Sequence, residues 1–143
     1  MPYPEQIFCE IERLHPRVGG GFRGVVKPFE FKGYHVPAGW MALDSILETH
    51  PIPTIYLEPE RFDPDCFSPQ GQEHKQRPFS LMGFGAGPRI CVGIAFAKME
   101  MKIVAAHLLR GYQWELVPNQ SLDSVQVPPV APKMGCAFIY QQL

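Results

Sequence analysis

Prolines restrict where this chain can form long helices. It has 16 prolines in 143 residues, about twice the usual share. Most of them lie in residues 36–69 and 118–133. Because proline lacks a backbone N–H and fixes φ, these two stretches are expected to be ordered coil with short strands. Long helices are therefore expected only outside them.

Two segments outside these stretches show helical periodicity. In residues 4–14 apolar side chains recur at spacings of four and three, Pro4 suits the first helical position, and Pro16 ends the helix. Residues 94–110 place a longer apolar stripe on one face. Gly111 follows this stripe and is expected at the left-handed C′ position that ends the helix. The sequence thus predicts two principal helices.

Short strands and irregular coil are expected elsewhere. Apolar and polar residues alternate in 29–31 and again in 34–36, and Lys32-Gly33 between them is expected to turn a hairpin. Three consecutive glycines within residues 18–22 predict a turn or tightly packed backbone. Residues 48–75 are expected to be irregular, and such a long irregular stretch should either be functional or be held by another part of the molecule. Further strands are expected at residues 40–47, 112–117 and 137–140.

Charge and cysteine usage exclude several classes of protein. The net charge is −1 and basic residues are scattered, which excludes a nucleic-acid surface. Because the sequence shows neither a secretory signal nor an apolar run of ~18 residues, we expect a cytoplasmic chain without a membrane anchor. The four cysteines are widely separated and form no Cys-x-x-Cys pair, which disfavours a disulfide framework or a zinc ribbon.

The strongest chemical signal is a glycine-rich segment that contains one cysteine. It reads Phe84-Gly85-Ala86-Gly87-Pro88-Arg89-Ile90-Cys91-Val92-Gly93. Cys91 lies just before the second predicted helix, whose dipole and unpaired N–H groups lower a thiol pKa and favour a metal-bound thiolate. Arg89 can pair with a carboxylate, and Phe84 can shield the sulfur from water. Glycines allow close approach of a flat ligand at positions 85, 87 and 93.

Other interpretations of this segment stay open on the residues alone. A buried, inert cysteine in a glycine-rich turn is one alternative. A cysteine hydrolase is a second, although no sequence context favours it. A P-loop is excluded because no Gly-Lys-Ser/Thr follows.

Two motifs resemble the cytochrome P450 family. Residues 84–93 resemble its haem-ligand signature, Phe-x-x-Gly-x-Arg-x-Cys-x-Gly, at every specified position. Glu10-Ile11-Glu12-Arg13 resembles the family's Glu-x-x-Arg helix. Residues 33–40 resemble its strand and Pro-x-Gly turn, and residues 18–23 are most similar to the cyanobacterial retinoic-acid-hydroxylase type. The resemblance covers nearly the whole chain.

The resemblance implies a fold and a set of site residues. The fold would be α+β, a C-terminal fragment of the mainly helical cytochrome P450 fold with a Pro-rich meander, and residues 1–143 would be a partial domain. Glu10 and Arg13 would form a buried structural pair that holds the meander. Cys91 would ligate the iron of haem, with Arg89 and Arg23 on the propionates. The other implied cofactor contacts are Phe84, Gly85, Gly87 and Gly93.

The implied activity is that of a haem-thiolate monooxygenase, which oxidises an apolar substrate with O2. Electrons would come from a ferredoxin or flavoprotein near Lys98 and Lys102, for which the alternative is a plain solvated helix face. Residues 18–22 and 132–135 would contact substrate. The chain lacks the family's distal helix, so the alternative function is a non-catalytic remnant or a haem-binding fragment without activity alone.

The chain also departs from the family pattern. Pro59-Glu60-Arg61-Phe62 resembles the family's Pro-Glu-Arg-Phe motif, but the spacing aligns that motif with Pro64-Asp65-Cys66-Phe67. Cys66 then replaces the arginine that completes a buried triad with Glu10 and Arg13. Losing one partner of such a network is expected to cost ~3–5 kcal/mol unless Arg61 compensates. Ile52 and Arg17 also stand where relatives usually carry Asp and Pro, which suggests relaxed constraint.

Overall fold

The computed structural model describes residues 2–71, 73–122, 124–125, 131–132 and 135–143. Two long helices dominate it, α1 at Pro2–Leu14 and α4 at Ile94–Gly111. The two short helices are α2 at Ile46–Thr49 and α3 at Glu73–Gln76, and 3-10 turns cover Pro64–Phe67 and Gly87–Arg89. No helix among the described residues is long and apolar enough to cross a membrane.

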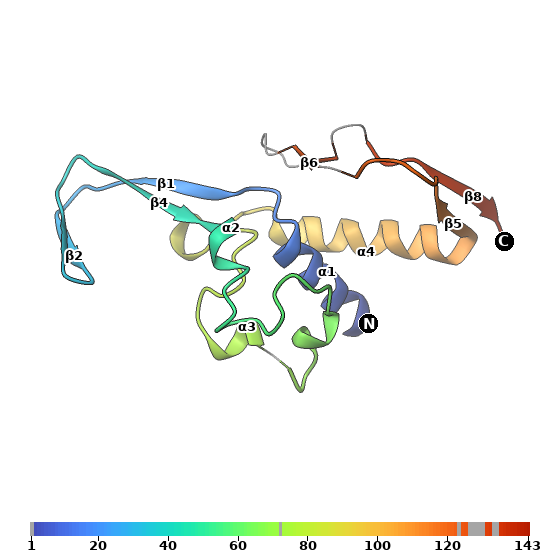
Figure 1. Ribbon diagram of the computed structural model, residues 1–143, viewed down its shortest axis with the longest axis horizontal. Coiled ribbons are helices and arrows are strands. Elements are labelled where there is room, and N and C mark those ends of the chain that lie inside the picture. The colour runs from blue at the N-terminus through green and yellow to red at the C-terminus, as the bar shows by residue number, and fades with distance from the viewer. Residues whose placement is uncertain (1, 72, 123, 126–130, 133–134) are drawn as a thin grey trace.

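The strands of the described residues pair as antiparallel two-stranded ribbons. Figure 1 shows β1 and β4 as an arm that leads away from the helices to β2 and β3, whereas β5 and β8 lie near the C-terminal end of α4. The pairs are β1 (Gly20–Gly24) with β4 (Met41–Ser45), β2 (Phe29–Phe31) with β3 (Tyr34–Val36), β5 (Tyr112–Leu116) with β8 (Phe138–Gln142), and β6 (Ser124–Val125) with β7 (Ala131–Pro132).

Two predictions about the arm are confirmed and one needs a correction. Lys32 and Gly33 have φ values of 49° and 83°, the left-handed conformations that a tight hairpin turn requires. The glycines of residues 18–22 form packed backbone rather than a turn, since a Cβ on Gly20 would lie 2.1 Å from the Asp44 carbonyl oxygen. The strand expected at 40–47 ends at Ser45, because its side chain accepts a hydrogen bond from the Glu48 N–H and caps α2.

The helix ends differ from the prediction by one or two residues. Helix α1 begins at Pro2, so Pro4 lies within the first turn, where a missing N–H leaves no hydrogen bond unmade. Gly111 is the last residue of α4 rather than a left-handed residue beyond it, and Tyr112 is already extended. The Leu143 N–H donates to the Gly111 carbonyl at 3.0 Å, which satisfies this helix end without a glycine cap.

The core lies between α1 and the Pro-rich coil that follows α2. Its apolar cluster is Cys9, Tyr56 and Phe67, and the buried polar residues are Glu10, Arg13, His50 and Ser80. Ile46 of α2 and Val25, which follows β1 and pairs with Trp40, are buried outside this cluster. Residues 48–75 are irregular as predicted, with only short helical turns. They are held to α1 by a cluster of Cys9, Tyr56 and Phe67. Among the described residues, all the buried side chains therefore lie before residue 81.

Candidate functional site

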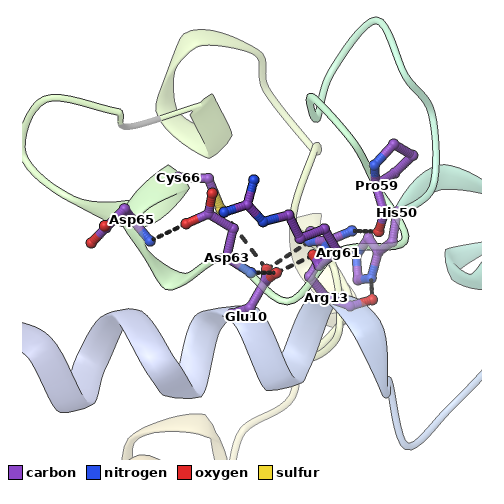
Figure 2. Close-up of polar contacts among 8 residues, drawn as sticks. All are labelled: Glu10, Arg13, His50, Pro59, Arg61, Asp63, Asp65 and Cys66. Carbon is purple, nitrogen blue, oxygen red and sulfur yellow. Dashed lines mark hydrogen bonds and ion pairs between the residues drawn. The ribbon is translucent and has the colours of Figure 1, made fainter.

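A buried ion pair joins α1 to the Pro-rich coil. Arg13 donates to both carboxylate oxygens of Glu10, from Nε at 2.7 Å and from Nη2 at 2.8 Å. It also donates to the carbonyls of Pro59 at 2.6 Å and Arg61 at 3.0 Å. The Asp63 N–H donates to Glu10 Oε1 at 2.7 Å. Figure 2 shows these contacts between α1 and the coil, and they match the structural role expected for Glu10 and Arg13.

Cys66 faces this pair, as the motif alignment predicts. Its Sγ lies 3.8 Å from Glu10 Oε2. Arg61 does not compensate with its side chain, which is 66% exposed and pairs with Glu58. The expected penalty of ~3–5 kcal/mol needs a correction, because it applies to a buried charge that has lost its partner. Here the Glu10 carboxylate still faces the Arg13 guanidinium, and backbone groups supply further hydrogen-bond partners to both side chains.

His50 links the same helix to the residue pair that precedes the cysteine loop (residues 84–93). Its side chain is 2% exposed, and its Nδ1 lies 2.9 Å from the Arg13 carbonyl oxygen. The Met82 N–H donates to Nε2 at 3.0 Å. Because a carbonyl can only accept, this arrangement requires a neutral ring with its proton on Nδ1. Burial lowers the pKa of His50, and the nearby Arg13 charge also lowers it.

The cysteine loop is closed by its own backbone. The Cys91 N–H donates to the Phe84 carbonyl at 2.9 Å, and the Gly85 N–H donates to the Met82 carbonyl at 2.7 Å. Gly85 and Gly87 have φ values of 77° and 66°, so both need the freedom of glycine. Gly93 has an ordinary φ of −85° and is the N-cap of α4. The free Cys91 thiol is exposed just before that helix.

A cavity of about 540 Å³ opens where α1, β1, β4, the cysteine loop and α4 meet, within the range of roughly 300–1,000 Å³ usual for small-molecule sites. It brings together five of the predicted cofactor residues, whereas Gly87 and Gly93 are not part of its lining. These five are Cys91, Arg89, Arg23, Phe84 and Gly85. Apolar walls come from Phe8, Ile11 and Met101, and further cations from Arg17 and Lys98.

This set of side chains fits haem. An accessible thiol can ligate iron, the apolar walls suit a porphyrin, and the arginines suit its carboxylates. No three histidine, cysteine or acidic side chains gather as a metal site among the described residues. An iron ion bound by Cys91 would take its other ligands from a porphyrin, as the iron of haem does.

Comparison with known proteins decides the family. The cytochrome P450 family model matches residues 1–134. The chain belongs to the cytochrome P450 family. It is 43% identical over 133 residues to a putative cytochrome P450 120 of Synechocystis sp., covering 93% of this chain and 30% of that protein. It is 38% identical over 136 residues to a beta-amyrin 28-monooxygenase of Barbarea vulgaris, covering 94% of this chain and 27% of that protein.

The fold matches a solved P450. A retinoic acid-bound cyanobacterial CYP120A1 superposes with a TM-score of 0.95 at 40% identity, covering 100% of this chain and 34% of the other. The match confirms the expected α+β fragment of the P450 fold. The chain thus spans about a third of the length of the relatives that it matches.

The charged side chains around the P450 cavity are partly engaged with one another. Arg23 Nη1 donates to the Phe22 carbonyl at 2.9 Å and lies 3.9 Å from Asp44 Oδ1. Lys98 Nζ lies 5.8 Å from the centre of the Phe84 ring. Lys102 forms an ion pair with Glu5 of α1. Neither lysine is therefore a plain solvated charge on the helix, and redox-partner docking at them remains a prediction.

The substrate contacts expected from the P450 resemblance are described only in part. Val18, Gly20 and Gly21 line the cavity. The other expected segment, residues 132–135, includes positions 133 and 134, which lie outside the described residues.

Sequence reasoning missed Glu12, which also lines the cavity. It occupies a variable position of the Glu-x-x-Arg motif, its side chain packs against Gly83, and the backbone N–H groups of Gly83 and Phe84 lower the pKa of its carboxyl group. Nothing in the sequence alone pairs position 12 with position 83.

Proposed function

We propose that this chain provides the thiolate side of a P450 haem site, with Cys91 as the ligand to the iron. The observation that carries the proposal is the position of the exposed Cys91 thiol on the wall of an apolar cavity. A closed backbone loop holds it just ahead of α4.

The other site residues would bind and shield the cofactor. Arg89 and Arg23 would pair with the two propionates, and Phe84 would keep water from the sulfur. Gly85 would leave room for the flat ring, and Gly87 and Gly93 would extend this close contact around the loop. When bound with a thiolate ligand, haem supplies the oxygen activation by which one atom of O2 enters an apolar substrate.

We assign the monooxygenase reaction to the complete P450 domain to which this chain contributes. An apolar substrate would lie against residues 18–22, and a ferredoxin or flavoprotein would deliver electrons from the side of Lys98 and Lys102. The partly exposed side chain of Lys102 supports such docking, although its ion pair with Glu5 would have to be shared or opened.

A haem-binding chain without activity of its own is the second candidate. It is favoured by α4, which has no buried residue along its 18 residues. Its exposed apolar side chains include Phe96, Met99, Ile103 and Leu109. A large exposed apolar surface of this kind indicates a missing partner surface.

A spectrum of the reduced, CO-bound chain tests the thiolate assignment. We expect a strongly red-shifted Soret band that is lost in Cys91→Ser and kept in Cys136→Ser, a matched control because Cys136 is also an exposed free thiol. An unchanged band in Cys91→Ser would contradict the assignment. Turnover of an apolar substrate by this chain with a reductase would overturn the second candidate, which has no activity of its own.

A further inference from the structure

The side chain of Glu12 lies against Gly83, directly before the cysteine loop. It lies on α1 between the buried pair of Glu10 and Arg13, yet it contacts a different segment. A Cβ added to Gly83 would lie 2.3 Å from Glu12 Cγ and 2.9 Å from Oε1. Only glycine at position 83 lets the carboxyl group come this close.

The contacts of Glu12 lead directly to Cys91. The backbone N–H groups of Gly83 and Phe84 act on the Glu12 carboxyl group and lower its pKa. The carbonyl of the same Phe84 accepts the Cys91 N–H at 2.9 Å. Phe84 thus directly follows the glycine that packs against Glu12 of α1, and its carbonyl accepts the N–H of Cys91 itself. A change at Glu12 would reach Cys91 through Gly83 and Phe84.

Lys98 of α4 completes this arrangement from the other side. Its ammonium lies 5.8 Å from the centre of the Phe84 ring, and its charge acts on Glu12. Burial raises the pKa of Glu12, whereas Lys98 and the two N–H groups oppose that rise. A half-buried carboxyl group at this place costs free energy that an apolar side chain would not. The two N–H groups and the charge of Lys98, which lower that pKa, are the compensating interactions.

We propose that Glu12 is a positioning residue of the haem-ligand loop, which holds Phe84 so that Cys91 is oriented toward the cavity before the cofactor binds. The proposal rests on the function proposed above, because the orientation matters only if Cys91 is the iron ligand. Glu12 acts through Phe84 and does not touch the iron.

Amide hydrogen exchange of the full haem-free chain tests this directly. Glu12→Leu keeps the side chain's bulk and removes both acceptors, and exchange of the Phe84 and Cys91 N–H groups is expected to accelerate about tenfold or more. Glu12→Gln keeps one acceptor, so its exchange rates are expected to lie between those of Glu12→Leu and those of the native chain. Gly83→Ala should act in the same direction by displacing the carboxyl group. Glu100→Gln, an exposed carboxyl on α4, should leave exchange unchanged.

Two exchange results would overturn the positioning role. One is native exchange rates at residues 83–91 in both Glu12→Leu and Glu12→Gln. The other is an equal acceleration over residues 50–67, because Glu12 would then stabilise the whole fold rather than the loop. Acceleration confined to residues 83–91 supports the proposal.

The reduced, CO-bound spectrum separates this proposal from the function on which it rests. Glu12→Leu is expected to retain haem but to shift part of the Soret band to the less red-shifted position, with Glu12→Gln partly restoring it. A native chain without the thiolate band would contradict the proposed function, while the exchange data would still decide the role of Glu12. A native thiolate band that both Glu12 variants keep unchanged would overturn the Glu12 proposal alone.

Discussion

The two halves of this chain are built in different ways. From Cys9 to Ser80 the structure has a core, and that core is almost as polar as it is apolar. From Leu81 onward no described side chain is buried, although this half has the longest helix and the cysteine loop. The half that has a core lacks Cys91, and the half that contains Cys91 has no core among its described residues.

The difference teaches that the cysteine loop is positioned from outside itself. The residues that lead into it are linked to the first half by the hydrogen bond from the Met82 N–H to His50 and by the packing of Gly83 against Glu12. A third link, between Lys102 and Glu5, attaches α4 to α1. The first half is therefore a scaffold, and the second is a surface that the cofactor and further apolar contacts would complete.

The largest effect is expected at the buried ion pair. Arg13→Ala leaves the Glu10 carboxylate buried without its partner and should lower the free energy of unfolding by about 3–5 kcal/mol. Arg61→Ala, which removes an exposed guanidinium paired only with Glu58, should change it by about 0.5 kcal/mol or less. Urea unfolding of both variants checks this. Equal losses would mean that the scaffold does not depend on the pair.

A matched pair of phenylalanines tests the comparison by packing. Phe67 is 7% exposed and Phe96 is 64% exposed. Phe67→Ala should cost about 3–4 kcal/mol because it opens a cavity in the scaffold core. Phe96→Ala should fall within about 0.5 kcal/mol. A large loss for Phe96→Ala in the isolated chain would show that α4 is packed after all.

His50 gives the scaffold a pH dependence of defined sign. Its pKa is lowered below the ordinary 6.5, chiefly by burial, so the unfolded chain binds a proton more readily than the folded one. Its stabilising contribution is complete above pH 6.5 and is lost as the pH falls from there to the lowered pKa. The difference in unfolding free energy between the native chain and His50→Gln should shrink over that window.

The matched control for His50 is His74→Gln, because burial also lowers the pKa of His74. Within the described part of the chain, the His74 side chain makes no hydrogen bond to residues 82–91, so its variant should leave amide exchange at Met82 unchanged. A pH profile for His50→Gln that runs parallel to the native one would contradict the assigned neutral ring.

The smallest effect is expected at Cys66. Because backbone groups already complete the Glu10–Arg13 pair, Cys66→Ala should cost about 1 kcal/mol or less, the scale of a weak thiol hydrogen bond and a little packing. Thermal unfolding of Cys66→Ala and of Arg13→Ala compares the two losses of stability. A loss as large as that of Arg13→Ala would show that the thiol is an essential third member of the network.

Local patterns could predict much of the fold but not how its halves are joined. The hairpin at Lys32-Gly33, the two long helices and the position of Cys66 opposite Glu10 all follow from periodicity, turn chemistry or motif spacing. The ends of β4 and α4 depend on Ser45 and on the Leu143 N–H, which no pattern marks. His50 and Glu12 interact with backbone groups, which nearly every residue has. Their partners therefore could not be found from the sequence.

Hydrogen exchange with and without haem tests the division between scaffold and ligand loop most directly. We expect haem to protect the amides of residues 84–91 and of the first turn of α4 from exchange in the native chain but not in Cys91→Ser. Protection of residues 48–75 should be the same in both, because the Glu10–Arg13 network is complete without the cofactor. Equal protection of residues 84–91 in Cys91→Ser, or a scaffold that becomes protected only when haem binds, would contradict this division.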